Sequence, residues 1–239
     1  MSIQVLDQET GRGDPVRDSE QYPAPVNAFY SSYGKRALDL FAASVGLILL
    51  SPVLAIAACC IKFTSRGPVF YRQFRIGRGG RPFQILKFRS MTAQGAENNL
   101  KITIAGDPRI TPVGKVFRRY KLDELPQLWN VIRGHMSLVG PRPEVPGYVE
   151  EYTSEQRAVL SVRPGITDPA SLAYRHEEEI LAGQAAPEQF YRAKILPDKL
   201  LRNRAYLQKI TLRNDIGIIL KTISSSFLLT EKTTARRRL

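Results

Sequence analysis

Residues 40–61 contain no charged side chain, and this run limits what the chain can fold into more than any other feature. The sequence is LFAASVGLILLSPVLAIAACCI, 22 residues long. As a straight helix it would be about 33 Å long, close to the thickness of the hydrocarbon core of a bilayer. A buried core helix is the alternative, but the run is long for the core of so small a chain. We therefore expect it to enter a membrane.

Ser51 and Pro52 stand in the middle of this run. Proline removes a backbone hydrogen bond and bends a helix, and a serine hydroxyl can bond to the carbonyl left without a partner. Both flanks are basic, which favours the cytoplasmic side for both ends. We therefore predict a re-entrant helix–break–helix hairpin over residues 35–62, with Ser51 and Pro52 as its hinge. A single helix that crosses the membrane is the alternative.

The net charge of the chain is +13, from 35 Lys and Arg against 22 Asp and Glu. Residues 1–34 are polar and carry five acidic residues against two arginines, so residues 35–239 carry +16. We expect a flexible polar tail over residues 1–34 and a basic C-terminal end over residues 231–239. The excess indicates an anionic partner: nucleic acid, a phosphate-bearing substrate or a membrane surface. Two adjacent cysteines and two histidines exclude a zinc site of the usual spacing.

The hydrophobic pattern after the apolar run predicts an α+β domain that is mostly helical, over residues 63–230. Residues 69–91 alternate apolar and basic side chains around a glycine-rich turn, which is typical of two short strands. The turn lacks the dinucleotide-binding fingerprint, and the chain has no Walker-type loop. Amphipathic helices are expected over residues 147–161, 187–212 and 215–229, either packed on the core or lying in the membrane interface.

Asp123 and Glu124 form an acidic pair within a basic, largely helical segment, residues 113–139. Pro126 interrupts the helical spacing there, and proline is tolerated best in the first turn of a helix. The acidic pair is therefore expected at or beside a helix N-terminus. Capping acids in a local salt-bridge network are the alternative to a catalytic role.

A series of short motifs runs through the chain from about Lys35 to Arg163 and beyond. They are Lys35-Arg36-x-x-Asp39, Ser51-Pro52, Gly67-Pro68-Val69-Phe70, Arg75-x-Gly77, Lys87-Phe88-Arg89-Ser90-Met91, Asp107-Pro108-Arg109-Ile110-Thr111, Leu122-Asp123-Glu124-Leu125-Pro126-Gln127-Leu128, Met136-Ser137-Leu138-Val139-Gly140-Pro141-Arg142-Pro143 and Arg163-Pro164-Gly165-Ile166-Thr167. In these motifs and their order the chain resembles the bacterial sugar transferases, the monotopic phosphoglycosyl transferases that act on polyprenyl phosphate. Because only 34 polar residues precede the first motif, the resemblance implies the small form with the catalytic domain alone.

The resemblance implies a mechanism. Asp123 would be the nucleophile that attacks the β-phosphate of a UDP-sugar and expels UMP, and Glu124 would be its partner acid. The phosphosugar on Asp123 would then pass to undecaprenyl phosphate, in the first membrane step of exopolysaccharide, O-antigen or glycoconjugate synthesis. Mg²⁺ is implied as cofactor, bound by the Asp123 carboxylate and the diphosphate.

Five basic residues are candidates for binding phosphate or nucleotide: Lys87, Arg89, Arg118, Arg142 and Arg163. For each, solvation at the surface or lipid contact is the alternative. The implied location is the cytoplasmic face of the bacterial inner membrane, in contact with lipid and without a nucleic-acid partner; a homodimer remains open.

The chain departs from the family pattern at Lys121, where Ser is usual, at His135, where many relatives have Asp, and at residues 168–172. The last departure leaves the identity of the sugar open.

Three other functions fit parts of the sequence. A membrane-anchored nucleic-acid binder would account for the charge but not for an acidic pair among the bases. A non-catalytic scaffold of a polysaccharide assembly complex would not need Asp123 or Arg142. A nucleotide-sugar glycosyltransferase is disfavoured because the Asp-x-Asp metal motif of many such enzymes is absent from the sequence.

Overall fold

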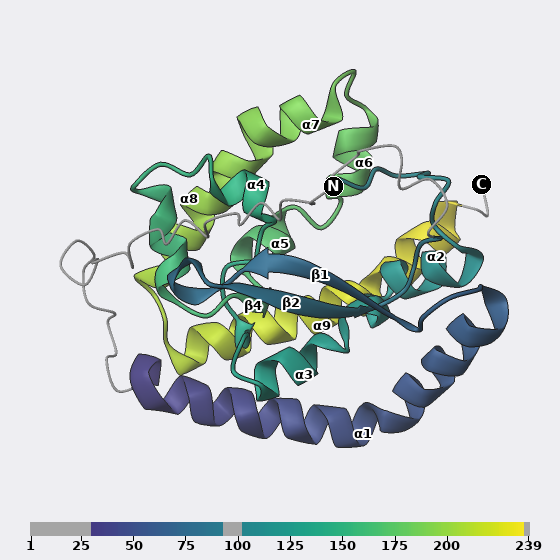
Figure 1. Ribbon diagram of the computed structural model, residues 1–239, viewed down its shortest axis with the longest axis horizontal. Helices are drawn as coiled ribbons and strands as arrows, with labels where there is room; N and C mark the ends of the chain where they lie inside the picture. The colour runs from purple at the N-terminus through teal and green to yellow at the C-terminus, as the bar shows by residue number, and fades with distance from the viewer. Residues whose placement is uncertain (1–29, 93–101, 237–239) are drawn as a thin grey trace, which may run out of the picture.

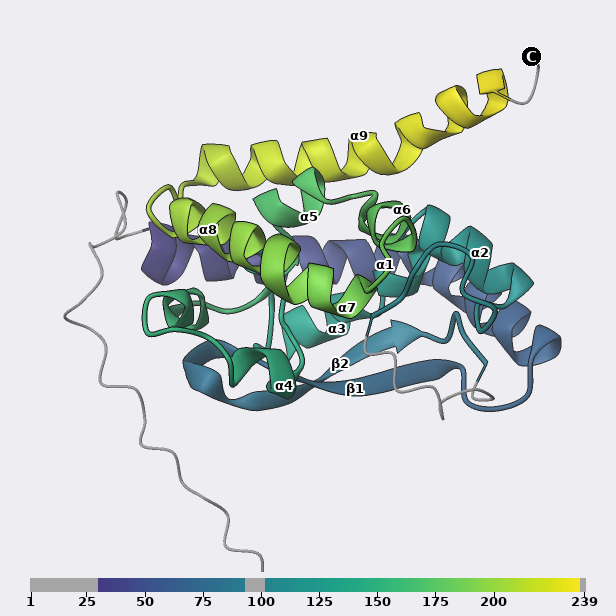
Figure 2. The ribbon, with the colours of Figure 1, turned by 90° about the horizontal axis from the view of Figure 1, so that it is seen from above.

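The structure is a computed structural model that describes residues 30–92 and 102–236. Its elements are η1 (Tyr30–Gly34), α1 (Lys35–Thr64), β1 (Phe70–Ile76), η2 (Arg78–Gly80), β2 (Pro82–Phe88), α2 (Pro112–Arg119), η3 (Leu122–Glu124), α3 (Gln127–Ile132), β3 (Ser137–Val139), α4 (Pro146–Val149), η4 (Gln156–Ser161), β4 (Gly165–Thr167), α5 (Pro169–Ala173), α6 (Glu177–Ala182), α7 (Pro187–Phe190), η5 (Tyr191–Ile195), α8 (Leu196–Leu207) and α9 (Leu212–Arg236). The mostly helical α+β composition is as predicted. The β1–β2 hairpin and α9 lie on opposite faces of the molecule (Figures 1 and 2).

The apolar run lies in one continuous helix, α1, along the lower edge of the molecule in Figure 1. Pro52 is inside this helix. The Ser51 hydroxyl donates a hydrogen bond of 2.8 Å to the carbonyl of Ile48, the group that a proline at position 52 leaves without its N–H partner. The predicted hydrogen bond of Ser51 is confirmed, whereas its role as a membrane hinge stays a prediction. The helix bends in its second half but does not reverse, so a bent helix stands where a break into two helices was expected.

One face of α1 packs on the domain and the other is exposed and apolar. Ala43 is buried against Leu128 and Val131 of α3, and Ile61 is buried against Phe88 and Phe117. The opposite face carries side chains that are between 65% and 86% exposed: Phe41, Ile48, Leu49, Ile56 and Phe63. This exposure excludes a buried core helix. By length and composition α1 is apolar enough to cross a membrane.

Both ends of α1 are tied to the same domain. Near its N-terminus, the Lys35 ammonium pairs with Asp215 of α9 at 2.5 Å, and Arg36 donates to the carbonyl of Val131 at 2.8 Å. At its C-terminus, Nη2 of Arg89 donates to the carbonyl of Ser65 at 2.8 Å. The two ends of the helix are therefore held on the same body.

Strands β1 and β2 form the predicted antiparallel hairpin, with Phe70 opposite Phe88 and Ile76 opposite Pro82. The turn between them needs glycine, because Gly79 has a φ of 67° and Gly80 a φ of 74°.

A second sheet was not predicted. Strands β3 and β4 are parallel and short, with Ser137 opposite Gly165 and Val139 opposite Thr167. The first residue of β4, Gly165, lies directly against the backbone of Gly140, which follows β3, so that a Cβ on Gly165 would lie 2.1 Å from the nitrogen of Gly140. Strands of three residues carry no periodic signal, and a parallel partner far along the chain leaves no local trace.

Several expected boundaries differ. The segment of residues 147–161 contains only the short α4 and η4, whereas α7, η5 and α8 cover most of residues 187–212. Helix α9 continues past residue 230 to Arg236, so the expected C-terminal end lies partly in this helix and partly outside the described residues. The expected flexible tail is wrong for residues 30–34, because Tyr30 is 7% exposed and donates to Asp215 at 2.8 Å. The rest of that tail lies outside the described residues.

Candidate active site

The acidic pair lies in a single 3₁₀ turn, η3, between α2 and α3. Lys121 precedes the turn in the left-handed conformation, and Pro126 stands at the start of α3, as the sequence predicted. Leu122 anchors the turn, because it packs on the apolar cluster that contains Ile61 of α1 and Phe88 of β2. The packing of α1 and β2 thus fixes the position of the carboxylates that follow Leu122.

Asp123 has a free carboxylate oxygen inside the protein. The residue is 5% exposed, and its Oδ1 has no hydrogen-bond partner among the described residues. Burial, followed by repulsion from Glu124, raises the pKa of Asp123, and attraction by Lys87, Arg118 and Lys121 partly offsets this rise.

Glu124 is held by two cations. The Lys87 ammonium lies 2.9 Å from Oε1 of Glu124, and the Arg142 guanidinium bonds to both oxygens, with Nη1 at 3.3 Å from Oε2 and Nη2 on Oε1. Burial alone would raise the pKa of Glu124, but attraction by Arg142 and Lys87 holds the pKa well below its usual range. Glu124 therefore holds two cations, whereas Asp123 beside it has no ion pair with any residue that the structure describes.

Lys87 reaches this pair from β2, and Asn130 fixes that strand. The Asn130 side chain donates to the carbonyl of Gln84 at 2.7 Å and accepts from the nitrogen of Leu86 at 2.9 Å. The Asn130 side-chain amide thus makes the two backbone hydrogen bonds that a neighbouring strand would otherwise make with β2. Asn130 was not among the predicted site residues, because an isolated asparagine gives no signal for this role.

Arg142 comes from the loop after β3, and Asp168 holds its backbone. Asp168 is fully buried, and its Oδ2 accepts from the Arg142 nitrogen at 2.7 Å and from the Asn203 side chain at 3.2 Å. Its Oδ1 accepts from the Ser171 nitrogen and so caps α5. The Asp168-Pro169 sequence is typical of a helix start and could have located the cap. The contact with Arg142 depends on the β3–β4 pairing.

The structure brings together some of the predicted phosphate-binding residues and not others. Lys87 and Arg142 meet at Glu124. Arg118, at the end of α2, is paired with Glu178 of α6, and its charge lowers the pKa of Asp123 against the larger effects of burial and Glu124. Arg163 instead donates from Nε to the carbonyl of Gly134 at 3.0 Å, and among the described residues no ion pair joins it to Asp123 or Glu124.

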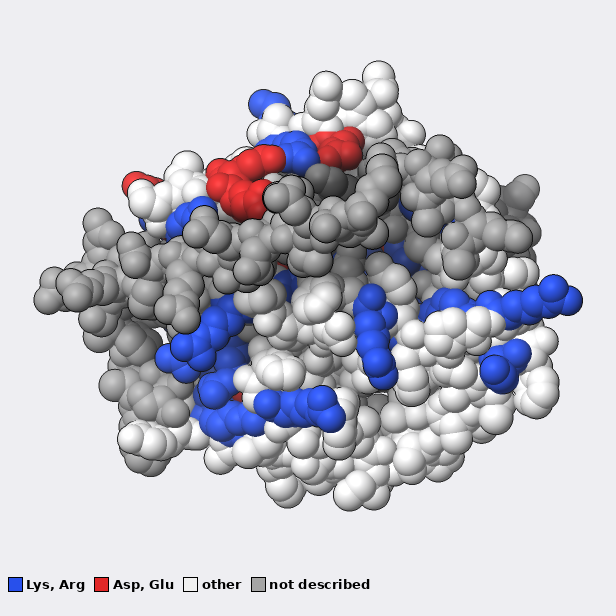
Figure 3. Space-filling model, in the orientation of Figure 1, with Lys and Arg blue, Asp and Glu red and all other residues white. Residues whose placement is uncertain are grey.

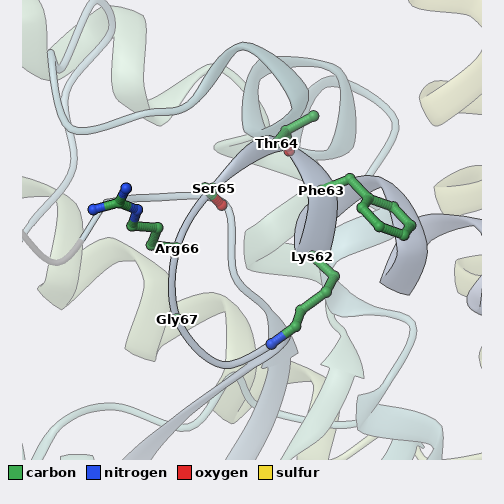
Figure 4. Close-up of a pocket in the computed structure, with 6 residues that line it drawn as sticks. All are labelled: Lys62, Phe63, Thr64, Ser65, Arg66 and Gly67. Carbon is green, nitrogen blue, oxygen red and sulfur yellow. The ribbon is translucent and has the colours of Figure 1, made fainter.

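Arg89 binds the end of α1 rather than the acidic pair. Its Nη2 donates to Ser65 at 2.8 Å and to the Ile61 carbonyl at 3.4 Å, as basic side chains often do at helix C-termini. Gly67, which has a φ of 119°, packs directly on the Arg89 guanidinium. A Cβ at position 67 would lie 2.4 Å from Nη1 of Arg89, so a larger residue there would have to displace the guanidinium. Figure 4 shows this loop, which lines a shallow hollow, with Phe63 and Arg66 pointing away from each other.

A family model described as bacterial sugar transferase matches residues 30–228. The chain belongs to the bacterial sugar transferase family. The match includes α1, the hairpin, the acidic pair and Arg142. The resemblance that the motifs indicated is thereby confirmed, and the protein is an enzyme of a transferase family.

Relatives of this bacterial sugar transferase are named for different sugars. The chain is 38% identical over 204 residues to the UDP-N-acetylgalactosamine-undecaprenyl-phosphate N-acetylgalactosaminephosphotransferase of Aeromonas hydrophila, a match that covers 84% of this chain and 44% of that protein. It is 39% identical over 194 residues to the UDP-glucose:undecaprenyl-phosphate glucose-1-phosphate transferase of Caulobacter vibrioides, with 80% and 68% covered. It is 37% identical over 204 residues to the exopolysaccharide production protein ExoY of Rhizobium meliloti, with 79% and 83% covered. Overall identity therefore does not assign a sugar.

The face of this bacterial sugar transferase that Figure 3 shows differs in charge between its upper and lower parts. In Figure 3 lysines and arginines gather over the lower half of the face, and acidic side chains gather at the top, over α4 and α7. The lower edge, where α1 lies, is white because its exposed side chains are apolar. Cations thus lie next to the apolar helix, an arrangement suited to an anionic, lipid-like surface.

The raised pKa of Asp123 predicts how the stability of this bacterial sugar transferase varies with pH. A carboxyl group whose pKa is higher in the folded state destabilises the protein once pH rises above the unfolded value of about 4, and the full cost is reached above the folded pKa. We expect Asp123→Asn to raise the Tm relative to wild type at pH 8 and to leave it nearly unchanged near pH 4. Thermal unfolding in detergent at both pH values measures this difference. A gain that is the same at both would contradict the raised pKa.

Proposed function

We propose that the protein transfers a sugar-1-phosphate from a UDP-sugar to undecaprenyl phosphate, with release of UMP. The observation that carries the proposal is the buried Asp123 carboxylate, whose Oδ1 has no partner among the described residues, beside a Glu124 already neutralised by Lys87 and Arg142. The names of the relatives support the donor and acceptor classes. In this role the enzyme would catalyse the first membrane step of exopolysaccharide, O-antigen or glycoconjugate synthesis.

The first chemical step uses Asp123 as nucleophile. A carboxylate oxygen of Asp123 forms a bond to the β-phosphorus of the UDP-sugar, and the bond from that phosphorus to the bridging oxygen breaks. UMP leaves with the electron pair of the broken bond, and the phosphosugar stays on Asp123 as an acyl phosphate. Asp123 suits this role because its Oδ1 has no hydrogen-bond partner in residues 30–92 and 102–236, and its burial excludes competing water.

The second step regenerates the enzyme. An oxygen of the undecaprenyl phosphate attacks the same phosphorus, the bond to Asp123 breaks, and the carboxylate is released. The product is undecaprenyl-diphosphate sugar. The phosphosugar thus transfers twice, with no net change at Asp123.

Cations are needed because negative charge concentrates around phosphorus in both steps. Arg142 has a planar guanidinium suited to phosphate oxygens, and the backbone bond to Asp168 fixes its position. Lys87 adds a second charge from β2. Glu124 holds both side chains in place before the substrate arrives, so their charges need not be reorganised during reaction.

Mg²⁺ is part of this proposal. Oxygen-ligated Mg²⁺ in phosphate-transfer sites uses one or two carboxylates and takes its other ligands from phosphate and water. The unpaired Oδ1 of Asp123 fits this need, whereas Glu124 is engaged with cations. Within residues 30–92 and 102–236 no group of three or more His, Cys, Asp or Glu could hold a metal alone. The ion would therefore be shared with the diphosphate, and when bound it would neutralise part of the phosphate charge.

The location that we propose is the cytoplasmic face of the inner membrane, with α1 inserted by its apolar face. The acceptor phosphate lies at a lipid surface and the UDP-sugar is soluble, so the site must stand at the boundary. Leu122 packs in the same cluster as Ile61 of α1, which supports a position of Asp123 close to the embedded helix. The ties of both α1 ends to one domain support a re-entrant rather than a crossing arrangement.

The topology can be tested with two cysteine probes. In a background with Cys59→Ala and Cys60→Ala, we expect Tyr33→Cys and Arg66→Cys to react with a membrane-impermeant maleimide in inverted inner-membrane vesicles but not in intact spheroplasts. These positions flank α1 and are exposed. Labelling of one probe in spheroplasts and of the other in inverted vesicles would indicate a crossing helix.

The activity itself is tested by UMP release from a panel of UDP-sugars, using purified protein in detergent. We expect release that depends on undecaprenyl phosphate and Mg²⁺ and is lost in Asp123→Asn. Silence across the panel from folded protein would contradict the proposal and favour a scaffold role. The sugar that supports turnover would identify the donor.

A further inference from the structure

Lys121 has a backbone conformation that lysine rarely adopts. Its φ is 57° and its ψ 22°, and it is the only non-glycine residue with a positive φ in the part of the chain that the structure describes. Glycine and asparagine are favoured in this left-handed region, because a Cβ there crowds the following carbonyl. Strained residues of this kind gather at functional sites, where the surrounding structure holds them.

The left-handed residue turns the chain from α2 into the acidic turn. The nitrogen of Lys121 donates to the carbonyl of Arg118 at 3.2 Å, and the carbonyl of Lys121 accepts from the nitrogen of Glu124 at 3.2 Å. Asp123 follows two residues later. The turn needs the backbone conformation, but nothing in these two backbone bonds needs a lysine side chain.

The Lys121 side chain differs from the other cations near Asp123 in having no ion-pair partner among the described residues. Lys87 and Arg142 are paired with Glu124, and Arg118 is paired with Glu178. Lys121 is exposed, and no ion pair of its ammonium is found within residues 30–92 and 102–236. It stands two residues before Asp123, and the hydrogen bond from the Glu124 nitrogen to its carbonyl ties it to the same turn.

We propose that Lys121 is a phosphate-binding residue of the active site, whose exposed ammonium receives a substrate phosphate group in front of Asp123. The inference rests on the proposed function and goes beyond it, because Lys121 is not among the five residues that the sequence predicted to bind phosphate. The phosphate can come from the diphosphate of the donor nucleotide or from the lipid phosphate of the acceptor. Binding to either is electrostatic and therefore weakens with salt.

The test measures binding to full-length protein that carries Asp123→Asn, so that no turnover occurs. UDP is the probe for the donor, followed by calorimetry in detergent. Nanodiscs with and without undecaprenyl phosphate are the probe for the acceptor. Lys121→Asn removes the charge and suits the left-handed backbone, whereas Lys121→Arg keeps both the charge and the strain. Lys115→Gln, at an exposed site on α2, is the matched loss of one charge.

We expect Lys121→Asn to weaken binding of at least one probe about three- to tenfold at low salt, with a smaller difference at high salt. Lys121→Arg should stay within about twofold of the parent, as should Lys115→Gln. The Tm of Lys121→Asn should be equal to or higher than that of the parent, because the backbone strain is relieved. The probe that is affected identifies the source of the phosphate.

Three results would overturn the inference: equal binding of both probes by Lys121→Asn and the parent, equal weakening by Lys121→Asn and Lys121→Arg, or equal weakening by Lys115→Gln. A lower Tm in Lys121→Asn would show a structural role instead. If the parent itself binds neither UDP nor undecaprenyl phosphate, the proposed function fails together with this inference. Binding by the parent with no effect of Lys121→Asn removes only the inference.

Discussion

Asp123→Asn is expected to lower the rate of UMP release by about 10⁴-fold or more, the scale seen when a nucleophile is removed from an enzyme. An amide of the same shape cannot form the acyl phosphate, and the rest of the site remains. The protein should stay folded, because the Oδ1 of Asp123 makes no hydrogen bond to any described residue that the substitution would break. Steady-state release of UMP with saturating lipid acceptor measures the loss.

The same experiment can detect the intermediate. With a UDP-sugar and no lipid acceptor, wild-type protein should gain the mass of one phosphosugar on the peptide that contains Asp123, and Asp123→Asn should not. Asp198→Asn is a matched control, because it removes a carboxylate that pairs with Arg202 on α8. A loss of less than about tenfold in Asp123→Asn would contradict the nucleophilic role.

Glu124→Gln is the second change with a large expected effect. It should destabilise the protein by about 3 kcal/mol, because Lys87 and Arg142 would remain in a largely buried site without their anion. For a chain of this size that corresponds to a fall in Tm of roughly 6–12 °C. Turnover should fall by about 10²–10³-fold as the two cations lose their fixed positions. Thermal unfolding in detergent and UMP release measure the two effects.

Two further variants make the result specific. Glu178→Gln breaks the half-exposed pair with Arg118 and should cost less than about 1 kcal/mol. Combining Glu124→Gln with Lys87→Met removes one of the unpaired cations, so the double variant should be more stable than the sum of the single losses predicts. Additive losses would mean that Lys87 and Glu124 do not act as a pair.

Acid should weaken the same pair in wild-type protein. Because the pKa of Glu124 is lowered in the folded state, its stabilising contribution is present above the unfolded value of about 4.3 and is lost as pH falls toward the folded pKa. Glu124→Gln should lack this part of the acid dependence. This trend is opposite in sign to the one expected from Asp123, whose cost appears as pH rises.

Local features of the sequence predicted a substantial part of the fold. The uncharged run with basic flanks predicted a long apolar segment, and its serine predicted the hydrogen bond beside Pro52. Alternating residues around three glycines predicted the hairpin, because neighbouring side chains in a strand point to opposite faces. The acidic pair and Pro126 predicted the turn before α3. The order of the motifs predicted the family.

Only the tertiary structure decided what each of these residues contacts. The sequence predicted Arg89 as a phosphate-binding residue as readily as Lys87, yet Lys87 pairs with Glu124 while Arg89 binds the end of α1. Asp168 gave a local signal for its helix cap but none for its contact with Arg142, and Asn130 gave none for its contact with strand β2, because these partners come from distant segments. Turn and helix signals depend on neighbouring residues and can be read locally. Ion pairs and backbone contacts between distant segments depend on where the folded chain returns, which local patterns do not specify.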